Sequence, residues 1–157
     1  MKIAILKERR PHETRVAATP ETVKKLRGLG VAEIIVEAGA GTAAAYTDEA
    51  FAEAGATIVP DAAAASAAAD VIFKIQRPMS AAEGTDEMAL LRAGQVLMSP
   101  LSALTNRELV QALAAGGVTS FALELIPRIT RAQSMDILSS QANLAGYKSV
   151  LLAANHF

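Results

Sequence analysis

The chain has 157 residues, 52% of them hydrophobic and 20% charged, which is enough for one ordinary core and predicts a single domain. Fifteen basic and sixteen acidic residues leave a formal charge of -1, so nothing indicates nucleic-acid binding, which usually shows as clustered lysine and arginine. The chain has no cysteine, which excludes disulfides, thiolate catalysis and zinc–thiolate sites and fits a reducing, cytoplasmic location.

The apolar runs of the chain are short. The run at 2–6 is followed at once by a charged cluster, and the later run at 149–154 is equally brief. A signal peptide or a membrane-spanning helix needs a much longer apolar stretch. We therefore expect no direct insertion of this chain into a membrane.

Short apolar runs alternate with helical patterns over the first 123 residues. A strand is predicted at 2–6, and a helix follows with Thr19 as N-cap and Pro20 at its first position. Thr47 is predicted to cap the second helix, which ends at Gly55. The other predicted strands are 33–37, 56–59, 70–75, 95–99 and 118–123, and the later helices are 61–70 and 109–117.

Strands separated by helices of about ten residues form parallel βαβ units. This predicts an α/β fold with a doubly wound, mostly parallel sheet of the Rossmann-like or flavodoxin-like type. Thr105 and Glu108 have the spacing of a capping box ahead of the helix at 109–117.

The last segment differs from the rest. A helical pattern runs from Ser134 to Phe157 without a glycine stop, which is long for a helix on a small sheet. We interpret 1–133 as an N-terminal α/β domain and 134–157 as a connecting helix. The alternative is a terminal helix that docks on its own sheet or on a second subunit.

One glycine-rich stretch resembles a dinucleotide-binding fingerprint. Gly39, Gly41 and Ala44 match G-x-G-x-x-A after a predicted strand, with Asp61 about twenty residues further on. A true fingerprint starts its helix within the glycines, so that the helix N-terminus faces the pyrophosphate. Here the helix starts only at Thr47, so we interpret the stretch as a turn.

Two segments near predicted strand ends carry cations that could bind an anion. The loop at 7–20 holds Lys7, Arg9, Arg10, His12 and Arg15, and it should lie at the carboxyl edge of the sheet, where open α/β folds bind ligands. Most of these side chains are expected to be solvated. Arg15, which precedes apolar residues, is the candidate for gripping a carboxylate or phosphate.

Lys74 lies inside the predicted strand 70–75, on the same face as Gln76. A lysine buried in a strand needs a partner or a ligand, because an unpaired ammonium there is costly. The alternative is an edge position with the ammonium in solvent.

The densest polar cluster follows the last predicted strand and consists of Arg128, Arg131, Gln133, Asp136 and Ser139. Helix capping by Ser134 and Asp136 explains part of it, but not Arg128 and Gln133. The two histidines, His12 and His156, are too few and too terminal to predict a metal site.

Four stretches resemble the N-terminal part of the alanine dehydrogenase and nicotinamide nucleotide transhydrogenase family. They are "KIAILKERRPHETRVAATPE", "KIQRPM", "ALTNRELV" and "LELIPRITRAQSMDILSSQANLAGYKSV". The similarity covers essentially all 157 residues and is greatest to the NAD(H)-binding alpha subunit of the proton-translocating transhydrogenase.

The resemblance implies an enzyme with two Rossmann-like domains that works as a homodimer and binds NAD(H) between the domains. Hydride then passes to NADP(H) on another component, and a membrane component couples this step to proton translocation. Such a chain is cytoplasmic and peripheral to the membrane complex. Arg128, Gln133, Asp136 and Ser139 are implied to contact the nicotinamide, with Gln133 and Asp136 as the catalytic candidates. The role of Tyr147 stays open.

The dehydrogenases of this family hold pyruvate with residues matching Arg15 and Lys74, and use a histidine after the fifth strand. Here that motif reads "VLMSPLSAL", with Ser99 and Ser102 and no histidine. Reductive amination needs an acid/base group, whereas hydride transfer between two nicotinamides needs aligned rings and exclusion of water. The absence favours the transhydrogenase. An alanine dehydrogenase-like fragment and a non-catalytic, dimerising α/β domain are the alternatives.

The family's NAD-binding Rossmann domain, and a returning segment that completes the first domain, both follow the long helix. Neither is present in these 157 residues. We therefore expect the chain alone to be inactive and to bind NAD(H) weakly or not at all.

Overall fold

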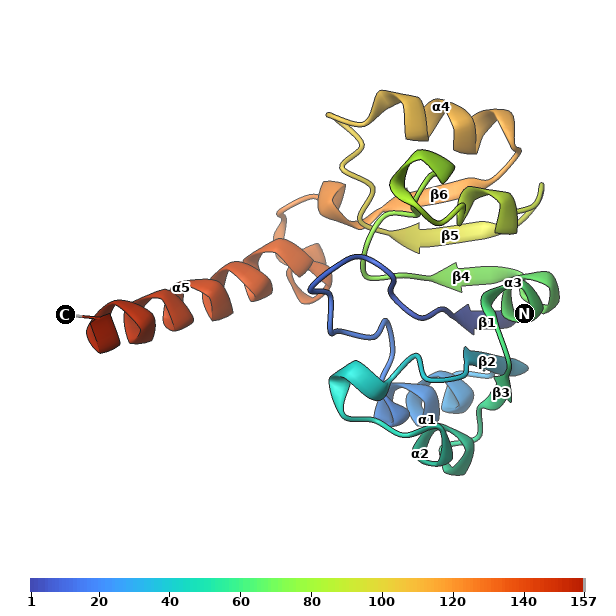
Figure 1. Cartoon of the computed structure of the whole chain (residues 1–157), viewed down its shortest axis with the longest axis horizontal. Helices are drawn as coiled ribbons and strands as arrows, with labels where there is room; N and C mark the ends of the chain where they lie inside the picture. The colour runs from blue at the N-terminus through green and yellow to red at the C-terminus, as the bar shows by residue number, and fades with distance from the viewer. Residues whose placement is uncertain (157) are drawn as a thin grey trace.

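The computed structural model describes residues 1–156, and over that range it contains one six-stranded sheet in the order β3-β2-β1-β4-β5-β6 (Figure 1). Every pair of neighbouring strands is parallel. The predicted α/β fold is therefore confirmed. The strands are β1 (Lys2–Ile5), β2 (Glu33–Glu37), β3 (Thr57–Val59), β4 (Val71–Phe73), β5 (Val96–Ser99) and β6 (Thr119–Ala122).

Helices follow the strands, and several begin at caps that the sequence predicts. Thr19 Oγ1 accepts the Thr22 N–H at the start of α1, and Thr47 Oγ1 accepts the Ala50 N–H at the start of α2. The α-helices are α1 (Pro20–Gly28), α2 (Asp48–Glu53), α3 (Ala62–Ala68), α4 (Arg107–Ala115) and α5 (Ile137–His156). Short 3₁₀ turns are η1 (Thr42–Ala44), η2 (Ala81–Glu83), η3 (Met88–Leu90), η4 (Leu123–Leu125) and η5 (Thr130–Met135).

The core has two halves, one on each face of the sheet. Alternate residues of β1 point to opposite faces, so Ile3 and Ile5 pack with Val23 of α1 and Phe51 of α2. On the other face, Leu6, directly after β1, and apolar residues of β1, β4 and β5 pack with α3 and α4: Ala4, Ile72, Leu97, Ala65, Leu109 and Leu113. Helices on both faces are what the prediction of a doubly wound sheet required.

Half of one face is poorly covered. Helices α1 and α2 pack beside β1, β2 and β3, but Phe73, Val96 and Met98 on the same face are only partly buried. Phe121, which pairs in register with Met98 on the edge strand β6, is 54% exposed. A cavity of about 470 Å³ lies here, lined by Met98, Phe121, Leu125 and Met135 among other apolar residues.

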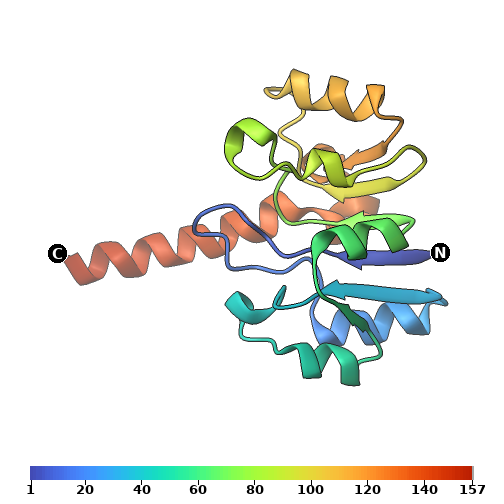
Figure 2. The same ribbon diagram turned by 45° about the vertical axis from the view of Figure 1, so that its right-hand side comes forward.

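Helix α5 projects away from the sheet, and only its first turns lie beside the α/β body (Figures 1 and 2). None of its residues is buried. It begins at Ile137 rather than at Ser134, because residues 130–135 wind as the tighter 3₁₀ turn η5. The exposed large apolar side chains of α5 are Leu138, Leu144, Tyr147, Val150, Leu151 and Leu152.

The predicted capping box at Thr105 and Glu108 is wrong. Helix α4 has Asn106 as its N-cap, and the Thr105 hydroxyl donates to the Ser102 carbonyl instead. Ser102 has φ 53°, so the chain makes a left-handed turn there that uses Thr105 before the helix starts. A true capping box forms elsewhere, between Ser80 and Glu83 at η2.

Candidate functional site

The loops after β1, β4, β5 and β6 meet at the carboxyl edge of the sheet, close to the first turn of α5 (Figure 1). The strand order reverses between β1 and β4, and such a switch point is where open α/β sheets bind ligands. The loop 6–19 follows β1, and Lys74 follows β4 directly. The topology therefore brings the two predicted cation-bearing segments to the expected place.

Asp136 is the N-terminal cap of α5. Its Oδ1 accepts the N–H groups of Leu138 at 2.9 Å and Ser139 at 3.0 Å, while the Ser139 hydroxyl donates to Oδ2 at 2.6 Å. The hydroxyl of Ser139 is the main cause that lowers the pKa of Asp136; the two N–H groups and the charge of Arg128 add to the effect. Asp136 is thus an ionised carboxylate at the start of a helix.

The other members of the polar cluster are free at the surface. Arg128 and Gln133 are exposed, and within residues 1–156 their side chains form no hydrogen bond or ion pair. Arg131 is also exposed. The cluster consequently divides into a cap, formed by Asp136 and Ser139, and unengaged donor and acceptor groups that precede it.

Arg15 is held by an acidic neighbour and reaches α5. Its Nε donates to Glu13 Oε1 at 2.8 Å, its Nη2 donates to Glu13 Oε2 at 2.6 Å, and its Nη1 donates to Gln141 Oε1 at 3.0 Å. Gln76 Nε2 also donates to Glu13 Oε2 at 2.6 Å. Hydrogen bonding to the Arg15 guanidinium lowers the pKa of Glu13 to about 2.

Lys74 is buried immediately after β4, with 3% of the residue exposed. Its Nζ donates to Glu87 at 2.8 Å and to Glu8 at 3.2 Å, and both carboxylates are buried as well. The prediction that a buried lysine has a partner is confirmed, and the alternative of a solvated edge lysine is wrong. Glu8 also accepts the Ile75 N–H, and Glu87 accepts the Met79 N–H, so backbone groups orient both acids.

Arg15 and Lys74 line one cavity of about 260 Å³ together with the start of α5. Its other lining residues include Val16, Ile75, Pro100, Leu123, Ile137, Ser140 and Gln141. The structure thus joins the predicted anion-binding pair to the helix that begins after the polar cluster. The partners of this pair were not predicted from the sequence; they are Glu8, Glu13, Glu87 and Gln141. The burial of Lys74 indicated that it needs a carboxylate partner, but it did not identify which acidic residue that is.

The glycine-rich stretch is a turn tied to α2, as the sequence indicates. The Gly39 N–H donates to both carboxylate oxygens of Asp48, and α2 begins only at that residue. Gly41 packs so closely that an added Cβ would lie 2.5 Å from Phe51 Cε2. Gly41 therefore serves close packing and Gly39, at φ 71°, a left-handed turn, which explains both glycines without a dinucleotide.

The segment after β5 carries no imidazole. Ser99 Oγ donates to the carbonyls of Gln76 and Pro100. The N–H groups of Leu101 and Ala103 donate to the two carboxylate oxygens of Glu124. Hydrogen bonds thus tie Ser99 and the residues after β5 to Gln76 and Glu124, and these residues include no histidine that could exchange protons near neutral pH.

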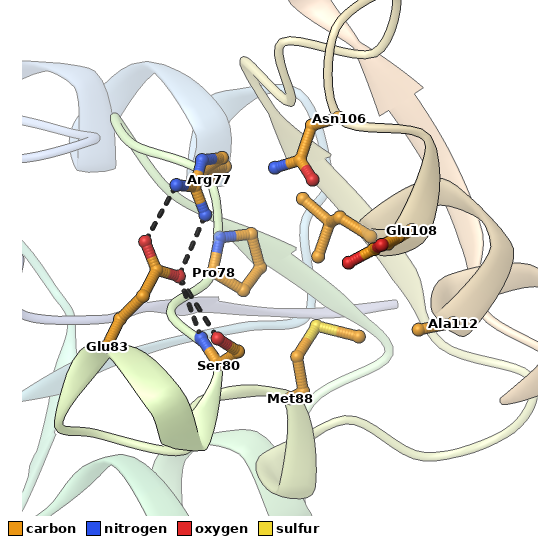
Figure 3. A pocket seen from close by; sticks show the side chains of 9 residues that line it. Arg77, Pro78, Ser80, Glu83, Met88, Asn106, Glu108 and Ala112 are labelled. Carbon is orange, nitrogen blue, oxygen red and sulfur yellow. Dashed lines mark hydrogen bonds and ion pairs between the residues drawn. The ribbon is translucent and has the colours of Figure 1, made fainter.

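A separate cavity, of about 320 Å³, lies between the loop after β4 and the start of α4 (Figure 3). At its rim Glu83 accepts two hydrogen bonds from Arg77 and one from Arg10, and these bonds lower the pKa of Glu83. Asn106 and Glu108 form the opposite wall. No predicted site residue lies here.

Two further classes of site find no support in residues 1–156. That range contains no group of three or more histidine, aspartate and glutamate side chains arranged to hold a metal ion. None of its helices combines the length and apolarity needed to cross a membrane.

A parallel sheet wound on both faces, with polar loops at the switch point of its carboxyl edge, defines a Rossmann-like α/β domain. The family profile described as "Alanine dehydrogenase/PNT, N-terminal domain" matches residues 4–145. The chain therefore belongs to the alanine dehydrogenase/PNT family, and the resemblance predicted from its sequence is confirmed.

Individual relatives fall in both branches of the family. The NAD(P) transhydrogenase alpha subunit (first part) of Rhodospirillum rubrum is 62% identical over the whole chain, which spans 41% of that protein. The crystal structure of transhydrogenase from Sinorhizobium meliloti matches with a TM-score of 0.88 and 48% identity, covering 99% of this chain and 44% of that one. Alanine dehydrogenase of Mycobacterium tuberculosis is 34% identical over 99% of the chain, which spans 40% of it.

Proposed function

We propose that this chain is the N-terminal part of the NAD(H)-binding component of a proton-translocating NAD(P) transhydrogenase. The observation that carries the proposal is the polar segment at the base of α5, in a chain 62% identical to a transhydrogenase alpha subunit. The activity of the complete enzyme is hydride transfer between NAD(H) and NADP(H), coupled to proton translocation.

The residues at the base of α5 fit a nicotinamide carboxamide, which offers an N–H₂ donor and a carbonyl acceptor. Arg128 and Gln133 supply unengaged donors, and Gln133 and the ionised Asp136 supply acceptors. Ser139 holds Asp136 in place through its hydroxyl. When bound, NADH supplies the hydride. The residues of this chain orient the ring and exclude water, and Gln133 and Asp136 are the catalytic candidates.

Several features support a domain that needs further parts of a protein. The chain spans less than half the length of the relatives it matches, and the sheet face around Phe121 is bare. Helix α5 projects away from the α/β body (Figure 2), and its large apolar side chains are exposed. We propose that a second, Rossmann domain follows α5 and that a returning segment covers the bare face around Met98 and Phe121.

The same proposal gives the partners and the location. The complete component forms a homodimer and acts with an NADP(H)-binding component and a membrane component. It is cytoplasmic and peripheral to the membrane complex. Exposed apolar residues of α5, such as Tyr147 and Val150, are suited to be covered by a second domain or a second subunit.

The alternative function is that of an alanine dehydrogenase, and the family membership itself favours it as the second candidate. Two observations weigh against it. Arg15 and Lys74, which would hold the substrate carboxylate, are each engaged by glutamates. The segment after β5 also lacks the acid/base histidine that reductive amination requires.

Calorimetric titration with NADH tests whether the chain contains only one half of the NAD(H)-binding site. We expect no binding at micromolar NADH to the 157-residue chain alone, and binding to a protein in which the chain continues into its second domain. Replacing Arg128 with alanine should weaken that binding, whereas replacing Arg107, an exposed arginine on α4, should not. Micromolar binding of NADH to the isolated chain would refute the proposal that the chain contains only half of the site.

A further inference from the structure

Gln141 forms a polar contact between the side of α5 and the α/β body. Its Oε1 accepts a hydrogen bond from Arg15 Nη1 at 3.0 Å, across 126 positions of sequence. The other anchor at the helix base is Ile137, which is half-buried in the groove with Ala17 and Leu123. From Leu138 onward every described residue of α5 is exposed, Gln141 included, so the direction of the helix is determined by contacts at its base.

Arg15 is built to hold Gln141 in one place. The two bonds from its Nε and Nη2 to Glu13 form a planar, two-pronged pair, which fixes the orientation of the guanidinium. Glu13 is itself held by Gln76 from the segment after β4. The chain Gln76–Glu13–Arg15–Gln141 therefore runs from the loops at the switch point of the sheet to the side of α5.

A contact at the base of a long helix has a large effect at its far end. The 20 residues of α5 span about 30 Å at the helical rise, so a tilt of about 10° at the base moves the far end by about 5 Å. A rotation of the first turn also moves Asp136 and Ser139, because both lie within six positions of Gln141. A small movement at this contact therefore shifts the positions of both ends of α5.

We propose that Gln141 is a positioning residue, and that its hydrogen bond to Arg15 fixes the axis and rotation of α5. The consequence for the nicotinamide rests on the proposed function: the contact places Asp136 and Ser139 and the domain that follows α5 relative to each other. Positioning at this level matters because hydride transfer tolerates little misplacement of the rings.

The direction of α5 is measurable in the 157-residue chain itself. The chain has no cysteine, so spin labels can be placed at Lys24→Cys on α1 and Asn155→Cys on α5, both exposed. Pulsed electron–electron double resonance then gives the distribution of distances between the two spin labels. The parent should show one narrow peak, and Gln141→Leu, which removes the acceptor and leaves the apolar anchor Ile137, should broaden it or shift it by several ångströms.

Three further variants separate the contact from general effects on the helix. Arg15→Lys loses the planar fork and should broaden the distribution like Gln141→Leu. Gln141→Glu retains an acceptor for Arg15 and should keep the parental width. Gln111→Leu is the matched control, because Gln111 is an exposed helical glutamine on α4 whose side chain forms no hydrogen bond within residues 1–156. Circular dichroism establishes that each variant is folded.

A parental distribution in Gln141→Leu would overturn the proposal, and so would equal broadening in Gln111→Leu. Broadening in Gln141→Leu and Arg15→Lys, with parental width in Gln141→Glu and Gln111→Leu, supports it. The measurement uses no nucleotide, so its failure is distinct from a failure of the proposed function. The latter would show as absent NADH binding in the completed protein whatever the width of the distance distribution.

Discussion

Replacing Lys74 with methionine tests whether its ammonium serves the fold. The side chains of Lys74, Glu8 and Glu87 are 1 to 2% exposed, and Lys74 Nζ lies 2.8 and 3.2 Å from the two carboxylates. Methionine has a similar length and no charge, so Lys74→Met removes the ion-pair partner of Glu8 and leaves Glu87 with the more distant Arg9 Nη1, at 3.6 Å. Breaking a buried ion pair from one side costs about 3–5 kcal/mol.

That cost is large compared with the total stability of a small domain, which is about 5–15 kcal/mol. With a urea slope of about 2 kcal/mol per molar, a loss of about 4 kcal/mol lowers the midpoint of unfolding by about 2 M. Equilibrium urea unfolding followed by circular dichroism measures this shift. The slope itself should stay unchanged, because the same surface is exposed on unfolding.

Lys2→Met is the matched control. Lys2 Nζ also lies 2.8 Å from a carboxylate, that of Glu33, but the Lys2 side chain is 48% exposed. Solvent screens such a pair, so the midpoint should move far less than in Lys74→Met. If both variants lost the same small amount of stability, a structural role for the Lys74 ion pair would be refuted.

Three other predictions concern a carboxylate, a glycine and a helix cap. The pKa of Glu13 is lowered from 4.5 to about 2, so between these pH values the folded state binds fewer protons than the unfolded state. The contribution of Glu13 to stability is therefore full at neutral pH and is lost as the pH falls towards 2. Urea unfolding at pH 7, 4 and 3 should show this decline, and Glu13→Gln should reduce it. Gly41→Ala should lower the free energy of unfolding by about 1–3 kcal/mol through its clash with Phe51, whereas Gly28→Ala, which meets nothing within 4 Å, should be neutral or stabilising by up to about 1 kcal/mol in thermal unfolding. Asp136→Ala should lower helix content in circular dichroism because α5 loses its cap, and Asp136→Asn should retain most of it; equal helicity in all three proteins would contradict the capping role.

The fold was predictable because its signals are local. Apolar runs such as 33–37 and caps such as Thr19 and Thr47 depend on neighbours within a few positions, and each produced the expected element. The capping box predicted at Thr105 failed because a second local feature competes for the same hydroxyl. The Thr105 hydroxyl donates to the carbonyl of Ser102, which lies in a left-handed turn. The spacing of Thr105 and Glu108 does not predict that turn.

The site was less predictable because its contacts are long-range. The buried position of Lys74 required a carboxylate, but the chain offers many, and Glu8 and Glu87 are 66 and 13 positions away. The bond between Arg15 and Gln141 depends on where α5 leaves the sheet, which hydrophobic periodicity does not encode. The roles of Arg128, Gln133, Asp136 and Ser139 towards nicotinamide stay predictions.

The decisive assay for the proposed function is hydride exchange between NADH and an oxidised NADP analogue. The protein to assay is the chain continued into the proposed second domain and combined with an NADP(H)-binding component. We expect exchange, a fall of about an order of magnitude or more in Asp136→Asn, and no oxidation of alanine by NAD. Oxidation of alanine without exchange between the nucleotides would contradict the assignment to the transhydrogenase branch.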